Sequence, residues 1–174
     1  MDNIKLIVLD VDGVLTDGKL HIGSDGEEYK SFHTQDGMGI SLARYVGIKF
    51  AIITGRTSKA VSKRADELKI DYIYQGVSEK IKVLEELRGK LGIKPEEICY
   101  VGDDINDLPI LKVVGFPCAP NNAVPLVKQS VRYIAPSNGG EGAVREIIEE
   151  ILSKRGNYGE LIEDFIAGKV LGIQ

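Results

Sequence analysis

Aspartate residues cluster after two short apolar runs of the chain. Asp10 and Asp12 flank a single valine directly after the run 4–9, and a second group follows the run 98–101: Asp103, Asp104 and Asp107. Carboxylates held close together repel one another strongly unless a cation lies among them. A hard ion prefers such all-oxygen ligands, and Mg²⁺ takes fewer protein ligands than Ca²⁺. If the two runs are neighbouring strands, the aspartates predict a magnesium site.

Thr54 and Lys80 add a hydroxyl and a cation after further apolar segments. Together with backbone amides after Asp12, they can hold a phosphoryl group. Phosphoryl transfer depends mainly on positioning and on charge neutralisation. A carboxylate can attack phosphorus and form an aspartyl-phosphate, while a second carboxyl carries the proton. Each residue taken alone is ordinarily a turn residue, a helix cap or a solvated lysine, so the prediction of phosphoryl chemistry depends on the set.

An alternation of apolar strand patterns with amphipathic helix patterns must position these residues. Strands are expected at 4–9, 49–54, 71–74, 98–101, 115–119 and 131–134. Helices are expected at 36–46, 57–68, 78–91, 106–113, 123–129 and 143–152, with Thr57 or Ser58 capping the second and Ser78 capping the third. This order is typical of a Rossmann-like α/β fold, a parallel sheet sandwiched by helices. Ligands of such sheets bind beyond the carboxyl ends of the strands, where all of the residues above lie.

Two segments depart from this alternation. Residues 18–32 alternate apolar and polar side chains around a Ser-Asp-Gly turn, which predicts a small β-hairpin insertion. In the tail, about 156–174, a second apolar stripe follows a Gly-Asn-Tyr-Gly break: Leu161, Ile162, Phe165 and Ile166. The stripe packs either on its own domain or on a neighbouring molecule. No repeat or linker interrupts the chain, so we expect a single domain over 1–174.

The bulk composition restricts the cellular setting. The net charge of −4 provides no basic field for nucleic acid. The apolar run 4–9 is too short for a signal peptide, and no stretch approaches the roughly 20 apolar residues that span a membrane. Cys99 and Cys118 lack metal-ligand spacing, so we interpret them as buried apolar residues. We therefore expect a cytoplasmic protein with neither a nucleic-acid nor a membrane partner.

The motifs resemble those of a known superfamily. Asp-Val-Asp-Gly-Val-Leu-Thr at 10–16, Thr-Gly-Arg at 54–56, Lys80, and Gly-Asp-Asp at 102–104 followed by Asp107 look like the four motifs of the haloacid dehalogenase-like hydrolases. The resemblance implies that Asp10 is the nucleophile and that Asp12 is the general acid and base. It also implies the remaining roles: Thr54 and Lys80 bind the phosphoryl group, Asp10, Asp103 and the Asp12 backbone carbonyl hold Mg²⁺, and Asp104 and Asp107 orient the metal waters or Lys80.

Other features resemble one family within that superfamily. No large cap domain fits between Asp12 and Thr54. The hairpin, Asp-Gly-Met-Gly at 36–39, Tyr-Gln-Gly at 74–76 and Gly-Gly-Glu-Gly-Ala-Val-Arg-Glu at 139–146 are similar to 3-deoxy-D-manno-octulosonate 8-phosphate phosphatases. The resemblance implies a homotetramer in which hairpins pack together and a neighbour's surface closes each active site. It implies substrate contacts from Asp12, His33, Thr34, Gln35, Asp36, Gly37, Thr54, Gly55, Arg56, Arg64 and Lys80.

Physical reasoning supports part of that ligand set. A sugar-acid phosphate carries a carboxylate besides the phosphate, and Arg56 and Arg64 can supply bidentate recognition. The alternative for Arg64 is a solvated position on a helix, and the alternative for His33 is a hydrogen-bonded loop residue outside the chemistry. His21, within the hairpin, is interpreted as a packing residue at an interface.

The sequence thus favours a magnesium-dependent phosphatase that converts 3-deoxy-D-manno-octulosonate 8-phosphate to the free sugar acid in lipopolysaccharide biosynthesis. One alternative is a phosphatase for a nine-carbon sialic-type sugar acid 9-phosphate, because both substrates carry a carboxylate and a terminal phosphate. An alternative from another class is a non-catalytic regulatory domain. The presence of Asp10, Asp12, Lys80 and Asp103 argues against that class.

Overall fold

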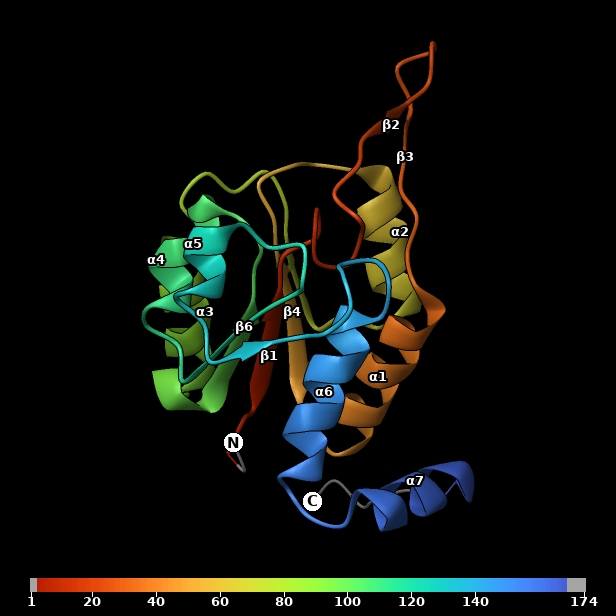
Figure 1. Ribbon diagram of the computed structural model, residues 1–174, viewed down its shortest axis with the longest axis vertical. Coiled ribbons are helices and arrows are strands. Elements are labelled where there is room, and N and C mark those ends of the chain that lie inside the picture. Colours follow the sequence, from red (N-terminus) through yellow and green to blue (C-terminus); the bar gives the residue numbers. More distant parts are fainter. Residues whose placement is uncertain (1–2, 169–174) are drawn as a thin grey trace.

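The computed structural model describes residues 3–168 and contains a six-stranded parallel sheet (Figure 1). The strand order is β5-β4-β1-β6-β7-β8. The strands are β1 (Leu6–Leu9), β4 (Lys49–Ile53), β5 (Tyr72–Tyr74), β6 (Ile98–Val101), β7 (Phe116–Ala119) and β8 (Tyr133–Ile134). β1 pairs in parallel with β4 on one side and with β6 on the other. The predicted Rossmann-like α/β class is confirmed, as are the six predicted strands.

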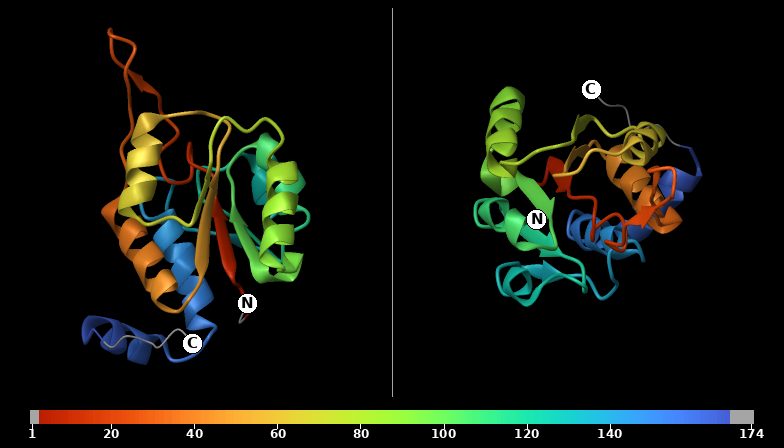
Figure 2. Two further views of the ribbon diagram at one scale, coloured as in Figure 1. Left: turned by 180° about the vertical axis from the view of Figure 1, so that it is seen from behind. Right: turned by 90° about the horizontal axis from the view of Figure 1, so that it is seen from above.

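Two apolar cores cover the two faces of the sheet. The four residues of β1 are all buried, as expected for a strand covered on both faces. Ile7 and Leu9 pack in a core shared with α1, α2 and α6, whereas Leu6 and Val8 pack in one shared with α3, α4 and α5 (Figure 2). The helices are α1 (Thr34–Tyr45), α2 (Lys59–Glu67), α3 (Lys80–Leu91), α4 (Leu108–Leu111), α5 (Pro125–Lys128), α6 (Ala143–Ser153) and α7 (Tyr158–Ile166), and the 3-10 turns are η1 (Pro95–Glu97) and η2 (Ile105–Asp107).

One predicted helix cap differs from the structure, and a second has the predicted position but lacks a capping hydrogen bond. α3 begins at Lys80 with Glu79, not Ser78, at the N-cap. A hydrogen bond from Val77 N–H to the Thr54 carbonyl (3.0 Å) ties the preceding loop to the end of β4, so the helix begins later. Ser58 does occupy the N-cap of α2, but its hydroxyl forms no capping bond and is buried without a partner among the described residues.

The helix predicted at 106–113 is also divided. The 3-10 turn η2 precedes the short helix α4. The division has a physical cause at Asp107, whose carboxylate turns back to accept hydrogen bonds from the backbone N–H groups of Asp103 (2.9 Å) and Asp104 (3.3 Å). The chain after β6 therefore forms a tight turn that keeps the aspartates together.

The predicted β-hairpin is present and stands away from the body of the molecule (Figure 1). Its strands β2 (His21–Ile22) and β3 (Glu28–Tyr29) are antiparallel. Gly26, with φ of 83°, supplies the left-handed conformation that the tip requires. Exposed apolar side chains lie on the hairpin: Leu20 (46% exposed), Ile22 (65%) and Tyr29 (61%).

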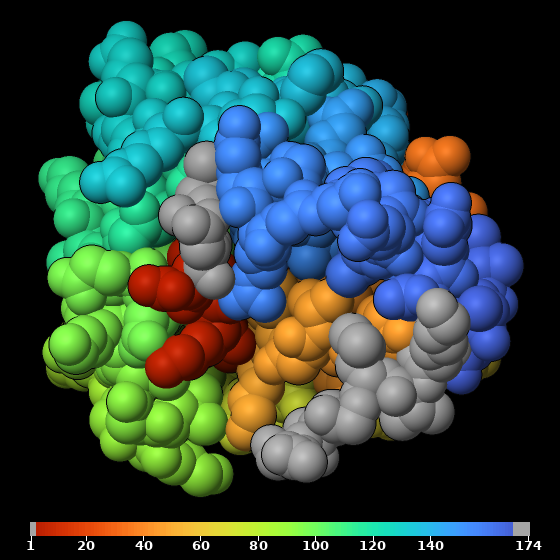
Figure 3. Space-filling model, turned by 90° about the horizontal axis from the view of Figure 1, so that it is seen from below, coloured from red at the N-terminus to blue at the C-terminus, as the bar shows by residue number. Residues whose placement is uncertain are grey.

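Helix α7 lies at the end of the molecule opposite the hairpin (Figure 1), and the view of that end shows the C-terminal segment, in blue, on its surface (Figure 3). Leu161, Ile162 and Phe165 of α7 pack on the protein's own core, with the Phe165 ring edge-on to Tyr45 at 5.3 Å between centroids. Ile166 is 78% exposed. The apolar stripe thus covers its own domain with all but its last residue, and the end of the predicted tail, 169–174, lies outside the described residues.

Two smaller predictions also have outcomes in the fold. Cys99 and Cys118 are buried and not disulfide-bonded, which confirms their interpretation as apolar core residues. Within 3–168, none of the helices has the length and apolar character needed to cross a bilayer.

Candidate active site

The central strand pair brings the two aspartate groups together. Leu9 of β1 is in register with Val101 of β6, so the loops that follow both strands leave the same edge of the sheet. The Asp10 backbone N–H also donates to the Val101 carbonyl (3.1 Å), which extends the pairing into the loop. The condition on which the predicted magnesium site depended, that the two runs are neighbouring strands, is therefore met.

Lys80 lies between two of these aspartates. Its Nζ is 2.7 Å from Asp10 Oδ2 and 2.7 Å from Asp107 Oδ1, and all three side chains are buried. Burial lowers the pKa of Lys80, but the carboxylates of Asp10 and Asp107 outweigh this effect and raise it above its usual value. Burial raises the pKa of Asp10 to about 6 against the opposing pull of Lys80. The position of Lys80 at the first residue of α3 is explained by this pairing.

Asp107 organises the turn after β6. Its Oδ1 accepts hydrogen bonds from Lys80 and from the hydroxyl of Tyr100 (2.5 Å), and its Oδ2 accepts the backbone bonds described above. Both oxygens are therefore engaged by protein donors. Of the two roles predicted for Asp107, the structure shows contact with Lys80. The carboxylate of Asp104 instead caps its own turn by accepting from Ile105 N–H (2.7 Å).

Asp103 supplies the feature that best fits a metal ion. Carboxylate oxygens of Asp10, Asp103 and Asp107 lie within 4.8 Å of one another. Asp103 Oδ1 is buried and has no hydrogen-bond partner among the described residues. Burial, followed by the repulsion of Asp10 and Asp107, raises the pKa of Asp103 to about 7. A hard cation between Asp10 and Asp103 would relieve both the unsatisfied oxygen and the repulsion, so the site fits Mg²⁺.

The aspartates open onto a cavity of about 240 Å³ at the carboxyl edge of the sheet. Seven predicted site residues line it, with catalytic, metal-binding, substrate-binding or supporting roles: Asp10, Asp12, Thr54, Gly55, Arg56, Asp103 and Asp104. Gly18 and Asn106 also line the cavity and were not predicted. Thr54 is buried at the end of β4. A phosphoryl group in this cavity would lie against the nucleophile candidate Asp10 and the hydroxyl side chain of Thr54.

A second predicted group lies outside this cavity. The cavity lining does not include residues 33–37 or Arg64. The guanidinium of Arg64 lies near Glu67 (3.2 Å) and over the Phe32 ring (6.0 Å). Asp36 is buried, and its Oδ1 accepts the Arg145 backbone N–H at the start of α6 (2.9 Å). Within one chain, these residues form a separate cluster around the beginning of α1.

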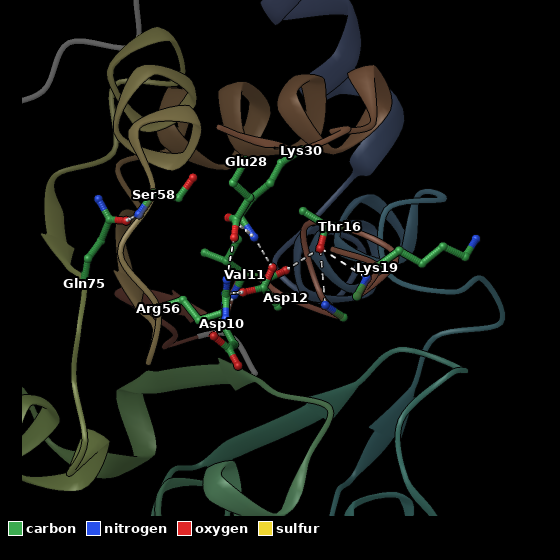
Figure 4. A network of polar contacts seen from close by, with 12 residues as sticks. Asp10, Val11, Asp12, Thr16, Lys19, Glu28, Lys30, Arg56, Ser58 and Gln75 are labelled. Carbon is green, nitrogen blue, oxygen red and sulfur yellow. Dashed lines mark hydrogen bonds and ion pairs between the residues drawn. The ribbon is translucent and has the colours of Figure 1, made fainter. Parts of the chain in front are cut away.

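Sequence reasoning missed two side chains that contact the site. Tyr100 is buried beneath Asp107, and its only sequence signal is a polar atom within an otherwise apolar strand. Lys30, from the hairpin arm, forms a hydrogen-bonded ion pair with Asp12 (Figure 4). A signal for Lys30 does exist, because Glu28 and Lys30 are two residues apart and so share one face of an extended arm.

A parallel sheet whose central strand ends carry these aspartates, with a lysine between two of them, defines the class of haloacid dehalogenase-like hydrolases. The profile of that class matches residues 70–148. The 3-deoxy-D-manno-octulosonate 8-phosphate phosphatase of Escherichia coli (strain K12) is 44% identical over 159 residues, which span 91% of this chain and 85% of the relative. The chain belongs to this phosphatase family.

Solved structures agree with this assignment. The 3-deoxy-D-manno-octulosonate 8-phosphate phosphatase from Moraxella catarrhalis, in complex with a magnesium ion, a phosphate ion and a KDO molecule, is 41% identical, with a TM-score of 0.91 and 94% of each chain covered. The cobalt-bound form of the enzyme from Haemophilus influenzae is 36% identical, with a TM-score of 0.88, covering 93% of this chain and 98% of that one.

Proposed function

We propose that this protein is a magnesium-dependent phosphatase that hydrolyses 3-deoxy-D-manno-octulosonate 8-phosphate to the free sugar acid and phosphate. The observation that carries the proposal is the buried Asp10–Lys80–Asp107 arrangement beside the unsatisfied Asp103 oxygen, in a chain 44% identical to such a phosphatase over 91% of its length. This product is a precursor of lipopolysaccharide, so we place the reaction in the cytoplasm, in lipopolysaccharide biosynthesis.

The chain's own residues account for both chemical steps. A carboxylate oxygen of Asp10 attacks phosphorus as the bond from phosphorus to the sugar oxygen breaks, and Asp12 gives that oxygen its proton. Water then attacks the phosphorus of the aspartyl-phosphate, and Asp12 takes the water's proton. The bond between Asp10 and phosphorus breaks, which releases phosphate and restores the Asp10 carboxylate. Lys80 and Thr54 hold the phosphoryl oxygens. Asp10, Asp103 and the Asp12 backbone carbonyl would hold Mg²⁺, which would neutralise the charge of the phosphoryl group.

We propose further that the enzyme is a homotetramer in which the cluster outside the cavity contacts the sugar acid of a neighbour. Two observations support this arrangement. The candidate contacts His33, Thr34, Gln35, Asp36, Gly37 and Arg64 line no part of the cavity in their own chain. The hairpin also exposes the apolar side chains of Leu20, Ile22 and Tyr29. Arg56 lines the cavity itself. In this arrangement, one substrate molecule contacts Arg56 of the chain that binds its phosphate and Arg64 of a neighbouring chain.

A substrate panel tests this function. Phosphate release is measured with Mg²⁺ from 3-deoxy-D-manno-octulosonate 8-phosphate, from a nine-carbon sialic-type 9-phosphate and from common hexose phosphates. We expect the highest kcat/KM for the octulosonate. A higher value for the nine-carbon substrate would reassign the substrate, and release from none of them would contradict the function.

The variant Asp10→Asn tests the mechanism. Because the amide is not a nucleophile, kcat should fall by at least about three orders of magnitude, as expected when a covalent catalyst is removed. The amide keeps the shape of the side chain, so the circular dichroism spectrum should match that of the wild type. Retained turnover in Asp10→Asn would contradict an aspartyl-phosphate on this residue.

A further inference from the structure

Lys30 is a buried lysine on an otherwise exposed arm of the hairpin. It directly follows β3, where Tyr29 is 61% exposed, yet the Lys30 side chain is only 1% exposed. Lysine is almost never fully buried unless it is paired. Here the ammonium forms a hydrogen bond with Asp12 Oδ1 and lies 3.0 Å from Glu28 Oε1 (Figure 4). The hairpin thus delivers a desolvated cation to the carboxyl that serves as proton carrier in the proposed function.

The pair belongs to a ring of alternating charges. Glu28 Oε2 accepts from Arg56 Nη2 (2.5 Å), and Arg56 Nε lies 3.8 Å from Asp12 Oδ2. The four charged groups are therefore contributed by three segments: the Asp12 loop, the hairpin arm and the loop after β4. The Lys30 side chain is buried, so removal of its partner Asp12 would leave an uncompensated charge, whereas Arg56 is 47% exposed and its pairs are screened by solvent. The strongest restraint on Asp12 comes from Lys30, which has the closest approach to it.

The orientation of the Asp12 carboxyl follows from these contacts. Oδ1 is held by Lys30, while the residue lines the cavity beside Asp10. The donor of the hydrogen bond to this carboxyl is the Lys30 ammonium. A proton carrier must lie within hydrogen-bond reach of the leaving oxygen, and a displacement of about 1 Å can cost on the order of 100-fold in rate.

We propose that Lys30 is a positioning residue that holds the Asp12 carboxyl for proton transfer to the leaving group. Lys30 touches neither the substrate nor the phosphorus in this assignment and acts through Asp12. The proposal rests on the proposed function only in taking Asp12 as the proton carrier. It assigns the hairpin a role inside its own chain, in addition to any contact with a neighbour.

The leaving group provides a selective test. Expulsion of a sugar alkoxide requires a proton, whereas the weakly basic p-nitrophenolate leaves without one. The parameter kcat/KM reports the steps up to release of the leaving group. We expect Lys30→Met to lower kcat/KM for the octulosonate 8-phosphate on the order of 10- to 100-fold, and for p-nitrophenyl phosphate by less than about threefold. Lys30→Arg, which restores a cation, should recover part of the loss.

Lys59→Met is the matched control. Lys59 pairs with Glu27 of the hairpin (3.6 Å), but its side chain is 92% exposed. This variant also removes one cation that contacts the hairpin, and we expect wild-type kcat/KM for both substrates. A crystal structure of Lys30→Met gives a readout independent of activity, because the Asp12 carboxyl should be displaced or spread over several orientations.

Three outcomes would overturn the proposal. An equal loss for both substrates would indicate a general structural role, a rise in KM with unchanged kcat would indicate a direct substrate contact, and an unmoved Asp12 carboxyl in Lys30→Met would exclude positioning. Failure of the proposed function is recognised separately, since it would appear in the wild type as no preference for the octulosonate. The comparison of leaving groups would then use glucose 6-phosphate as the alkyl substrate.

Discussion

Asp36 is a buried carboxyl group outside the cluster formed by Asp10, Asp103 and Asp107. Its Oδ1 accepts the Arg145 backbone N–H, while its Oδ2 is buried without a partner among the described residues. Burial raises the pKa of Asp36 from 3.8 to about 6, against the lowering effect of the Arg145 bond. The folded state therefore favours the protonated form. The stabilisation of the folded state by the protonated Asp36 carboxyl is fully present below about pH 4 and is lost as the pH rises through about 6.

Asp36→Asn should remove this pH dependence. Raising the pKa of Asp36 from 3.8 to about 6 corresponds to roughly 3 kcal/mol of unfolding free energy in total. About 1 to 2 kcal/mol of this free energy is lost between pH 5 and pH 8. The Tm of the wild type should therefore fall relative to that of the variant by several degrees over this range. Differential scanning fluorimetry of both proteins in EDTA at pH 5 and pH 8 measures the difference. An equal difference in Tm at both pH values would contradict the prediction.

Asp103 allows a prediction on metal binding. A ligand that binds only the folded state, at a concentration 100 times its Kd, raises the free energy of unfolding by about 2.7 kcal/mol. Saturating Mg²⁺ should therefore raise the Tm of the wild type by several degrees. Asp103→Asn should abolish most of that rise, because it removes the negative charge of a carboxyl group whose buried Oδ1 has no hydrogen-bond partner among the described residues. Asp25→Asn, on the exposed hairpin, is the control and should keep the full rise.

At the scale of elements, the turn before α6 supports the loop that carries Asp10 and Asp12. A Cβ atom on Gly139 would lie 1.9 Å from the Gly13 carbonyl oxygen. Asn122 connects the same two segments, since its Nδ2 donates to the Gly13 carbonyl (3.0 Å) and its Oδ1 accepts from Gly139 N–H (2.7 Å). The loop that carries Asp10 and Asp12 is therefore packed against backbone from the far end of the chain.

Gly139→Ala should disturb this packing. Forcing an extra carbon into a tightly packed site costs typically 1–3 kcal/mol, so the free energy of unfolding in urea should fall by that amount, and kcat should fall with it as the Gly13 backbone moves. Gly156→Ala is the matched control, because nothing lies within 4 Å of a Cβ at that position. Its effect on unfolding should stay within about 0.5 kcal/mol. Comparable effects of both substitutions would contradict the role of Gly139.

The helices and strands were more predictable than their end residues or the tertiary contacts that hold the site. Apolar runs and amphipathic spacing identify the strands, and strand-end positions then gather Asp10, Thr54 and Asp103, because all parallel strands end at one edge. The division at η2 was not predictable, since it depends on a side chain that folds back onto its own backbone. The contacts of Tyr100 and Lys30 depend on which elements pack side by side, and local spacing does not specify that.

At the scale of the whole molecule, the hairpin is the least self-sufficient element. Isolated two-stranded hairpins are marginally stable in water, and this one exposes Leu20, Ile22 and Tyr29. Burying one such side chain fully contributes about 1.5–3 kcal/mol. A partner surface over the hairpin would therefore stabilise it substantially. In the proposed homotetramer, that partner is the hairpin of a neighbouring chain.

Ile22→Asp should accordingly weaken the assembly. The new carboxylate would have to be buried among apolar side chains, which is unfavourable, so multi-angle light scattering should detect a smaller species than the tetramer expected for the wild type. Leu126→Asp, at a 52% exposed position on α5, is the control and should leave the mass unchanged. An unchanged mass for Ile22→Asp, or a monomeric wild type, would contradict the proposed assembly.

Loss of assembly should also affect catalysis, because the same hairpin carries Lys30 to Asp12 and Glu28 to Arg56. A hairpin without its partner surface would hold that ring of charges less firmly. We therefore expect Ile22→Asp to lower kcat/KM for the sugar-acid phosphate by about tenfold or more, and for p-nitrophenyl phosphate by less, as in Lys30→Met. If dissociated Ile22→Asp kept wild-type kcat/KM for both substrates, the active site would be complete within one chain and the hairpin would serve assembly alone.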